Sequence, residues 1–234
     1  MAANLPVVLV PGLLCSARLY SSQVTALWPS GQVTVADHRR DSDMAAIAAS
    51  ILANAPPRFA LAGLSMGGYI AFAMMRQAPE RIAKLALLDT SARPDMPEQT
   101  AGREKFMAMA EAGKLDEVVE TLLPRFLHRN RGSDEPLKDE VRAMARETGV
   151  AAFVRQQKAI MTRPDSRPLL SSIRCPTLVL VGDADELTPP DLAREIAAGI
   201  TGSTLTIVPD CGHLATMEKP AAVNAALSAW LTRD

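Results

Sequence analysis

The chain alternates short apolar runs with helix-length stretches, and this alternation limits the possible folds more than any other feature. The apolar runs lie at Pro6–Val10, Gln32–Ala36, Arg58–Leu64, Ile82–Leu88, Pro176–Val181 and Thr204–Val208. Strands that helices cover on both faces read as near-continuous apolar runs of this length. The helix-length stretches between and after them lie near Ala17–Leu27, Asp43–Ala53, Met66–Gln77, Pro190–Ala198 and Pro220–Leu231. We therefore predict an α/β fold, with a mostly parallel sheet of about six strands flanked by helices, and ligands at the carboxyl ends of the strands.

One interval, residues 92–167, lacks any strand-like run. Its apolar residues recur at steps of three and four, as in Leu115, Val118, Leu122 and Phe126, which is typical of helices. The sequence thus predicts a core in two parts, residues 1–91 and 168–234, separated by a helical cap insertion at 92–167. This insertion either packs as ordinary helices or covers the site.

The charge balance excludes several classes of partner. Lys plus Arg number 25 and Asp plus Glu number 26, so neither nucleic acid nor an anionic membrane surface is expected as a partner. Cys15, Cys175 and Cys211 are widely spaced and the chain has three histidines, so neither a disulfide framework nor a metal site is indicated. The amino terminus lacks a basic start and no run is long enough to span a membrane, which predicts a cytoplasmic protein of unknown oligomeric state.

The segment Gly63–Gly67 has the pattern G-x-S-x-G and contains the candidate nucleophile, Ser65. A predicted strand precedes it and a predicted helix follows at once, which is the context of a nucleophile elbow. Glycines on either side relieve the crowding of so sharp a turn. The alternative is that Ser65 only caps the following helix.

A serine hydroxyl needs a neighbouring base, and three histidines are available. His213 directly follows the last predicted strand and is the favoured base. His38 lies in the polar run DHRRDSD, where we expect it on the surface, and His128 is expected in a solvated loop of the insertion.

Two carboxylates follow the fifth predicted strand, and one of them is expected to orient the histidine. Asp185 lies deeper in this loop and is the favoured acid, whereas Asp183 is expected to cap the turn. Asp89, after the fourth strand, is the reserve candidate. The chain order of Ser65, Asp185 and His213 is that of a nucleophile-elbow enzyme.

Two backbone N–H groups should stabilise the oxyanion, and we expect them from Met66 and Leu13. Leu13 follows the first strand in the loop Pro11–Leu14. Leu14, Met107 and Phe126 are the candidate substrate-binding residues, although core packing is an alternative for each.

Four segments together resemble the α/β-hydrolase fold family across nearly the whole chain. They are Gly63–Gly68, Ala78–Asp89, Val181–Pro190 and Val208–Pro220. The resemblance identifies the aspartate of the acid loop with Asp185 and the histidine segment with His213. The sequence departs from the family pattern in three places: Pro11-Gly12 replaces His-Gly, the loop after the second strand has no glycine, and the usual amino-terminal antiparallel strand pair is missing.

The resemblance implies a serine hydrolase that cleaves a small carboxylic ester or thioester through an acyl-enzyme, a reaction that requires no metal or cofactor. The chain resembles shorter capped members of the family, such as the pimeloyl-ester carboxylesterases, and a carboxylesterase of this kind is the leading expectation. The alternatives are a lyase or a C–C bond hydrolase on the same triad, and a ligand receptor without turnover. The expected partner is a small-molecule ester.

Overall fold

The computed structural model describes residues 5–233 and contains one sheet of six strands, all parallel, in the order β2-β1-β3-β4-β5-β6. The strands are β1 (Val7–Val10), β2 (Val33–Val35), β3 (Phe59–Leu64), β4 (Ile82–Leu88), β5 (Thr177–Gly182) and β6 (Thr204–Val208). This sheet confirms the predicted α/β fold with a parallel sheet flanked by helices.

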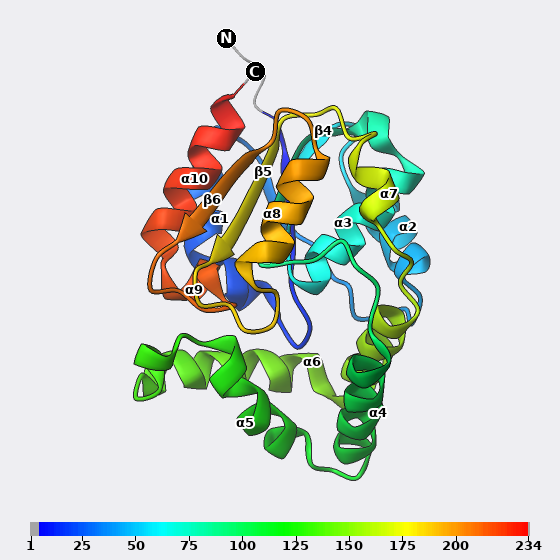
Figure 1. Ribbon diagram of the computed structural model, residues 1–234, viewed down its shortest axis with the longest axis vertical. Coiled ribbons are helices and arrows are strands. Elements are labelled where there is room, and N and C mark those ends of the chain that lie inside the picture. The colour runs from blue at the N-terminus through cyan, green and yellow to red at the C-terminus, as the bar shows by residue number, and fades with distance from the viewer. Residues whose placement is uncertain (1–4, 234) are drawn as a thin grey trace.

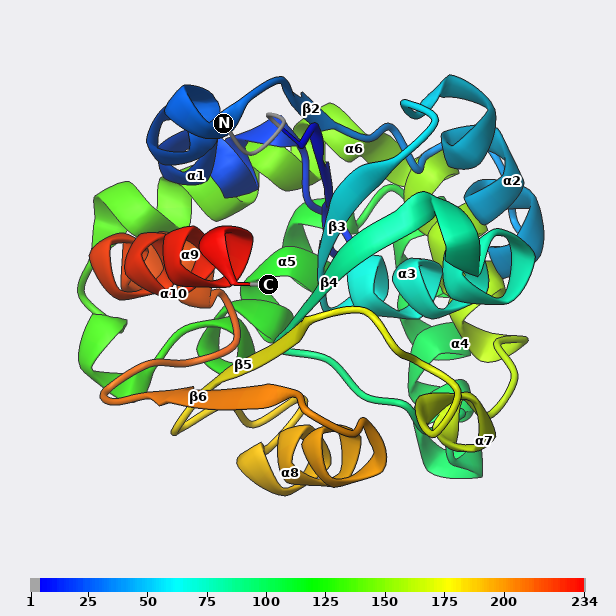
Figure 2. The ribbon, with the colours of Figure 1, turned by 90° about the horizontal axis from the view of Figure 1, so that it is seen from above.

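Helices cover both faces of the sheet, as the view from above shows (Figure 2). The helices are α1 (Ser21–Leu27), α2 (Met44–Asn54), α3 (Met66–Gln77), α4 (Pro97–Glu111), α5 (Leu115–Phe126), α6 (Glu135–Met161), α7 (Arg167–Leu170), α8 (Pro190–Gly199), α9 (Ala215–Glu218) and α10 (Pro220–Thr232). Buried side chains of α1, α9 and α10 form a core on one face, and those of α2, α3 and α8 form a core on the other. None of the helices among residues 5–233 combines the length and the apolar character needed to cross a membrane.

The apolar runs explain why the strands lie where they do. Every residue of β1, β3 and β5 is buried, because helices pack on both sides of these strands. The edge strands differ, since β2 and β6 keep exposed or half-buried positions. The six predicted runs match the six strands to within a residue or two at each end. The predicted helix at Ala17–Leu27 instead begins as a 3₁₀ turn and becomes α-helical at Ser21.

Between β4 and β5 the chain forms α4, α5 and α6, which we call the inserted helices. They lie together beyond the end of the sheet toward which the strand arrows point (Figure 1). Long α6 is kinked at Gly149, whose φ of 73° and ψ of 164° are not helical. Glycine adopts a positive φ without steric strain, so Gly149 allows α6 to change direction. The inserted helices thus stand at the edge where a parallel sheet binds ligands.

Candidate active site

Ser65 occupies the sharp turn between β3 and α3. Its φ of 55° and ψ of −115° are strained for a residue with a side chain. Two hydrogen bonds hold the strained residue: its N–H donates to the Leu88 carbonyl at 2.9 Å, and the Thr90 hydroxyl donates to its carbonyl at 2.8 Å. The geometry is that of a nucleophile elbow, which presents the hydroxyl at the edge of the sheet.

The glycines around Ser65 are required by close approach of the backbone. A Cβ on Gly63 would lie 2.2 Å from the carbonyl oxygen of Gly67, and a Cβ on Gly67 would lie 2.0 Å from that of Val10. Neither neighbour is a flexible side chain. The elbow therefore needs glycine at both positions, which explains the G-x-S-x-G spacing.

We expect Gly67→Ala to lower the free energy of unfolding by about 3 kcal/mol or more, because the added methyl group overlaps the backbone of β1. Gly102→Ala in α4 is the matched control, since a Cβ there meets nothing within 4 Å. This control should stabilise the protein slightly, as alanine is the better helix former. Urea unfolding of the three proteins measures both effects, and equal stability of the two variants would contradict the packing described for the elbow.

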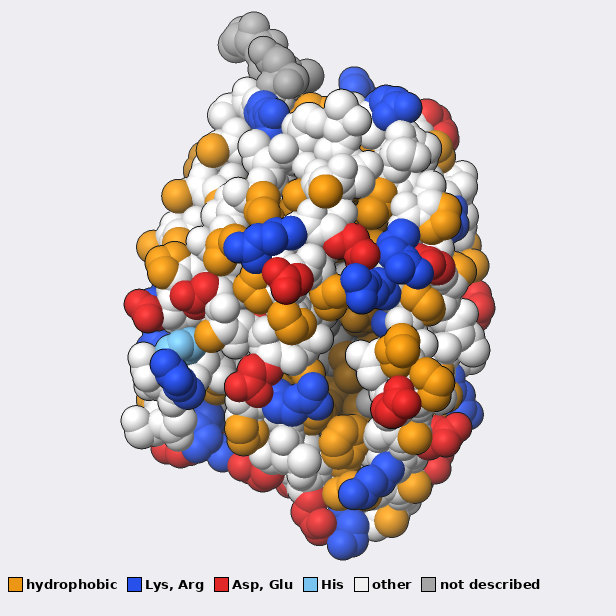
Figure 3. Space-filling model, in the orientation of Figure 1, with side chains coloured by type: hydrophobic (Ala, Val, Ile, Leu, Met, Phe, Trp, Pro, Cys, Tyr) orange, Lys and Arg blue, Asp and Glu red, His pale blue; other side chains and the backbone are white. Residues whose placement is uncertain are grey.

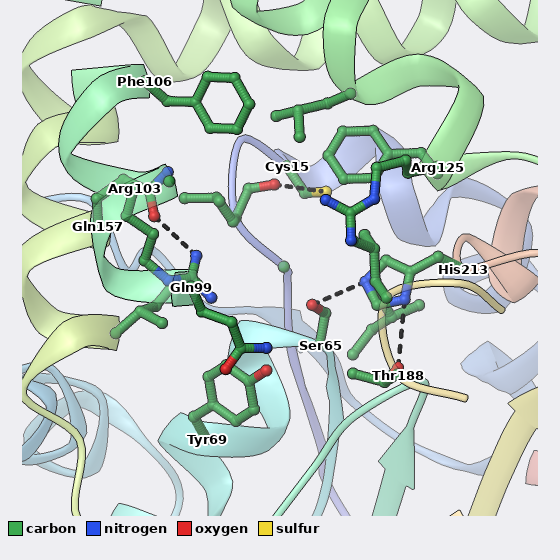
Figure 4. Close-up of a pocket in the computed structure, with 18 of the residues that line it drawn as sticks. Cys15, Ser65, Tyr69, Gln99, Arg103, Phe106, Arg125, Gln157, Thr188 and His213 are labelled. Atoms are coloured by element: carbon green, nitrogen blue, oxygen red, sulfur yellow. Dashed lines mark hydrogen bonds between the residues drawn. The ribbon is translucent and has the colours of Figure 1, made fainter. Parts of the chain in front are cut away.

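His213 lies in the loop after β6, 2 % exposed, and faces Ser65. Its Nε2 is 2.9 Å from the Ser65 hydroxyl, and its Nδ1 is 2.8 Å from Oδ2 of Asp185. The Phe126 ring lies beside the imidazole with its centroid 6.2 Å away. The structure thus brings Ser65, His213 and Asp185, which are far apart in the sequence, into one hydrogen-bonded chain. Figure 4 shows the contact between Ser65 and His213.

Asp185 is held by several donors besides the histidine. Its Oδ1 accepts hydrogen bonds from the N–H groups of Leu187 and Thr188, and its Oδ2 accepts one from the Thr188 hydroxyl at 2.6 Å. Burial alone would raise the pKa of Asp185, but the facing His213 and the Thr188 donors outweigh burial, so its pKa lies below the usual value. A carboxylate kept ionised in this way can fix the orientation of the imidazole.

The other two carboxylates considered from the sequence lie elsewhere. Asp183 accepts a hydrogen bond from the Cys211 N–H at 3.1 Å and so braces the loop that contains His213. Asp89 is fully buried and accepts from the Gly182 N–H at 2.9 Å. Burial raises the pKa of Asp89 well above its usual range. Neither residue contacts His213 in the part of the chain that the structure describes.

The two N–H groups expected to form the oxyanion hole are free to bind an oxygen. Within residues 5–233, the N–H groups of Leu13 and Met66 donate to no protein acceptor. Leu13 lines the same cavity as Ser65, and Met66 opens α3, where the first N–H groups lack helical partners. A Cβ on Gly12 would lie 3.4 Å from Cβ of Ser65, so this loop closely approaches the nucleophile.

The expectation that His38 lies on the surface is wrong. Its side chain is buried, and its Nε2 lies 2.9 Å from the carbonyl oxygen of Gly12. Gln156 of α6 is beside it, with Oε1 accepting from the Leu14 N–H at 3.2 Å and Nε2 lying 3.1 Å from the His38 ring. The run of charged neighbours concealed this contact, which forms only when the loops after β1 and β2 meet. His38 and Gln156 together support the loop that holds Leu13.

The burial of His38 predicts a pH dependence of stability. Burial lowers the pKa of this imidazole from 6.5 to about 4. Between pH 6.5 and about 4, the imidazole of His38 takes up a proton in the unfolded chain but stays neutral in the folded one. Protonation therefore favours the unfolded chain, and the free energy of unfolding decreases as the pH falls from 6.5 toward 4. The loss amounts to about 3 kcal/mol at 1.36 kcal/mol per pH unit of difference. His38→Gln should remove that dependence, and parallel pH profiles of the unfolding free energy in the two proteins would contradict it.

His128 is also buried rather than solvated, because the segment directly after α5 is hydrogen-bonded to the region around His213. Glu218 links the two: its Oε2 accepts from the His128 N–H at 2.8 Å and its Oε1 from the Gly212 N–H at 3.0 Å. The His213 N–H also donates to the Phe126 carbonyl at 3.0 Å. These bonds fix the end of α5 against the loop that contains His213.

A cavity of about 310 Å³ opens onto Ser65 and His213. It lies where the inserted helices meet the rest of the molecule, and Figure 3 shows a hollow there with hydrophobic side chains inside and charged ones at its rim. Of the expected substrate-binding residues, Phe126 lines the cavity. Leu14 does not, because it is buried in the core, and Met107 does not, because its neighbour Phe106 takes the facing position on α4.

Several cavity residues could not be identified from the sequence. Arg103, Arg125 and Gln157 point inward from three different helices (Figure 4). Cys15 also lines the cavity, but burial raises the pKa of its thiol to about 12, so it is protonated at neutral pH. Among residues 5–233, no group of three or more His, Cys, Asp or Glu side chains has the arrangement of a metal site.

Comparison with known proteins identifies relatives over nearly the whole chain. A model of the alpha/beta hydrolase family matches residues 7–226. A 2-hydroxy-6-oxononadienedioate/2-hydroxy-6-oxononatrienedioate hydrolase of Klebsiella pneumoniae is 32% identical over 186 residues, which span 74% of this chain and 62% of the relative. A malate-bound thermophilic esterase from Thermogutta terrifontis has a TM-score of 0.89 and 32% identity, covering 97% of this chain and 89% of that one. The enol-lactonase from Burkholderia xenovorans LB400 has a TM-score of 0.88 and 25% identity, with 97% and 91% covered.

Proposed function

The chain belongs to the alpha/beta hydrolase family, and from this premise we propose that it is a serine hydrolase that cleaves small carboxylic esters. The observation that carries the proposal is the 2.9 Å contact between the Ser65 hydroxyl and Nε2 of His213, with Asp185 on the far side of the ring. A hydroxyl in this position can lose its proton to the imidazole as it attacks a carbonyl carbon.

The proposed reaction proceeds in two halves. His213 takes the Ser65 proton while the serine oxygen attacks the ester, and the N–H groups of Leu13 and Met66 stabilise the developing oxyanion. His213 then gives the proton to the leaving alcohol, and an acyl group remains on Ser65. Water activated by the same imidazole hydrolyses this acyl-enzyme, which restores the serine. Asp185 holds the ring so that Nε2, not Nδ1, accepts the proton.

A series of p-nitrophenyl esters of increasing acyl length tests the proposal. We expect turnover of short esters, with a rapid first release of nitrophenol that equals the enzyme concentration whenever hydrolysis of the acyl-enzyme is slow. The cavity of about 310 Å³ limits the acyl chain, so activity should fall for long chains. Absence of turnover across the whole series would argue against an esterase.

A second candidate reaction is hydrolysis of a C–C bond beside a ketone. The observation that favours it is the 32% identity to the Klebsiella dienedioate hydrolase. Such a reaction would use the same three side chains on a vinylogous 1,5-diketone acid. Turnover of such a substrate can be monitored by the loss of its conjugated absorbance. This turnover, together with no hydrolysis of nitrophenyl esters, would favour the second candidate.

A further inference from the structure

Arg125 differs from the other arginines of the inserted helices because no protein group neutralises it. Within the described chain, its guanidinium has neither a carboxylate within ion-pair distance nor a hydrogen-bond acceptor. The others do have such partners: Arg103 pairs with Asp95, Arg142 with Glu120, Glu135 and Asp139, and Arg146 with Asp116, while Arg155 donates to the Arg39 carbonyl. The unpaired guanidinium therefore has donors available for a ligand.

The position of Arg125 is fixed relative to the candidate nucleophile. It lies in the last turn of α5, next to Phe126, whose carbonyl accepts the N–H groups of His213 and Leu214. Its side chain lines the cavity that contains Ser65 and His213, and Figure 4 shows the guanidinium extending into the space next to them. Any molecule whose carbonyl lies at Ser65 thus has Arg125 nearby.

The other charges of the cavity do not compensate Arg125. Arg103 is matched by Asp95, whose 2 % exposed side chain also pairs with Arg163, so this carboxylate serves two guanidinium groups. Glu98 is the carboxylate among the lining residues, and it is exposed and forms no ion pair with Arg125. The thiol of Cys15 remains protonated. The cavity wall is thus left with an excess of positive charge.

We propose that the substrate is an ester that also carries a free carboxylate, such as a half-ester of a short dicarboxylic acid, and that Arg125 binds this carboxylate while Ser65 attacks the ester. The inference rests on the proposed function and narrows it to anionic esters. Phe106, Leu122 and Phe126 line the cavity as well and give the intervening methylene groups an apolar surface. A guanidinium recognises a carboxylate with paired donors, which a neutral ester cannot use.

Matched pairs of esters test the proposal. Monomethyl adipate and methyl hexanoate share acyl length and differ in the terminal carboxylate, and shorter pairs can be built from glutarate and succinate. We expect the wild type to prefer the anionic member, and Arg125→Gln to lower its kcat/KM by about 10- to 100-fold with little effect on the neutral member. Arg129→Gln is the matched control, because Arg129 is exposed, unpaired within the described chain and outside the cavity lining. It should change neither rate.

Two further measurements make the outcome decisive. Added salt should weaken the preference for the anionic ester, since ions screen an exposed guanidinium. Calorimetric binding of monomethyl adipate to Ser65→Ala, with and without Arg125→Gln, reads recognition without turnover. Loss of binding in Arg125→Gln would support the role of Arg125, even if neither ester is hydrolysed. Absence of hydrolysis of both esters would instead overturn the proposed esterase activity. Equal losses for both members of a pair, or binding unchanged by Arg125→Gln, would overturn the role of Arg125.

Discussion

Ser65→Ala is expected to lower kcat for ester hydrolysis by about 10⁶-fold, the size of the loss found when a serine nucleophile is removed from a working triad. The hydroxyl contacts Nε2 of His213, whereas the thiol of Cys15, which lines the same cavity, is kept protonated by burial. Steady-state kinetics with the best p-nitrophenyl ester of the series measures the effect.

The variant should fold as well as the wild type. Alanine and serine are about equally strained at a φ of 55°, and the backbone bonds to Leu88 and from Thr90 remain. Ser228→Ala, an exposed change in α10, is the matched control and should leave kcat unchanged. Retention of more than about one hundredth of the activity in a folded Ser65→Ala protein would exclude Ser65 as the nucleophile.

Asp185→Asn is expected to lower kcat by about 10⁴-fold while the fold persists. Oδ1 can still accept from Leu187 and Thr188, so the loop keeps its shape. An amide nitrogen in place of Oδ2 would instead donate to Nδ1, which moves the ring proton to Nε2 and leaves no acceptor for the Ser65 proton.

Asp183→Asn provides the matched control for this loop. The asparagine oxygen can still accept the Cys211 N–H, so activity should stay near that of the wild type. A small effect of Asp185→Asn on kcat, or a large effect of Asp183→Asn, would contradict the assignment of Asp185 as the acid of the triad. The buried Asp89 would then be the next position to change.

The strands and the elbow could be predicted from the sequence because their causes are local. The runs that form β3 and β5 are apolar throughout since both sheet faces are covered, and the parallel arrangement places the residue after each strand at one edge. Ser65, Asp185 and His213 all follow strands, which is why their neighbourhood could be anticipated. The distances between them required the structure.

What the sequence did not reveal depends on contacts between distant segments. His38 sits in a charged run, and its burial arises from the Gly12 carbonyl and from Gln156, over a hundred residues further along the chain. On α4, Met107 was predicted to face the cavity, but Phe106 does so. The sequence pattern of α4 could not distinguish the two residues, because this helix buries little of its surface and so has no clear apolar face. The sequence alone could not identify Arg125 as a cavity residue, because its position in the cavity and its lack of a partner within the described chain depend on the folded structure.

Covalent labelling with a fluorophosphonate tests the central claim most directly, because the reagent reacts with a serine only when a neighbouring base activates its hydroxyl. We expect one adduct per chain, located by mass spectrometry on the peptide that contains Ser65. The labelling rate should be far lower in His213→Ala than in the wild type. An unmodified protein after prolonged exposure, or an adduct elsewhere with Ser65 intact, would contradict the assignment of Ser65 and His213 as nucleophile and base.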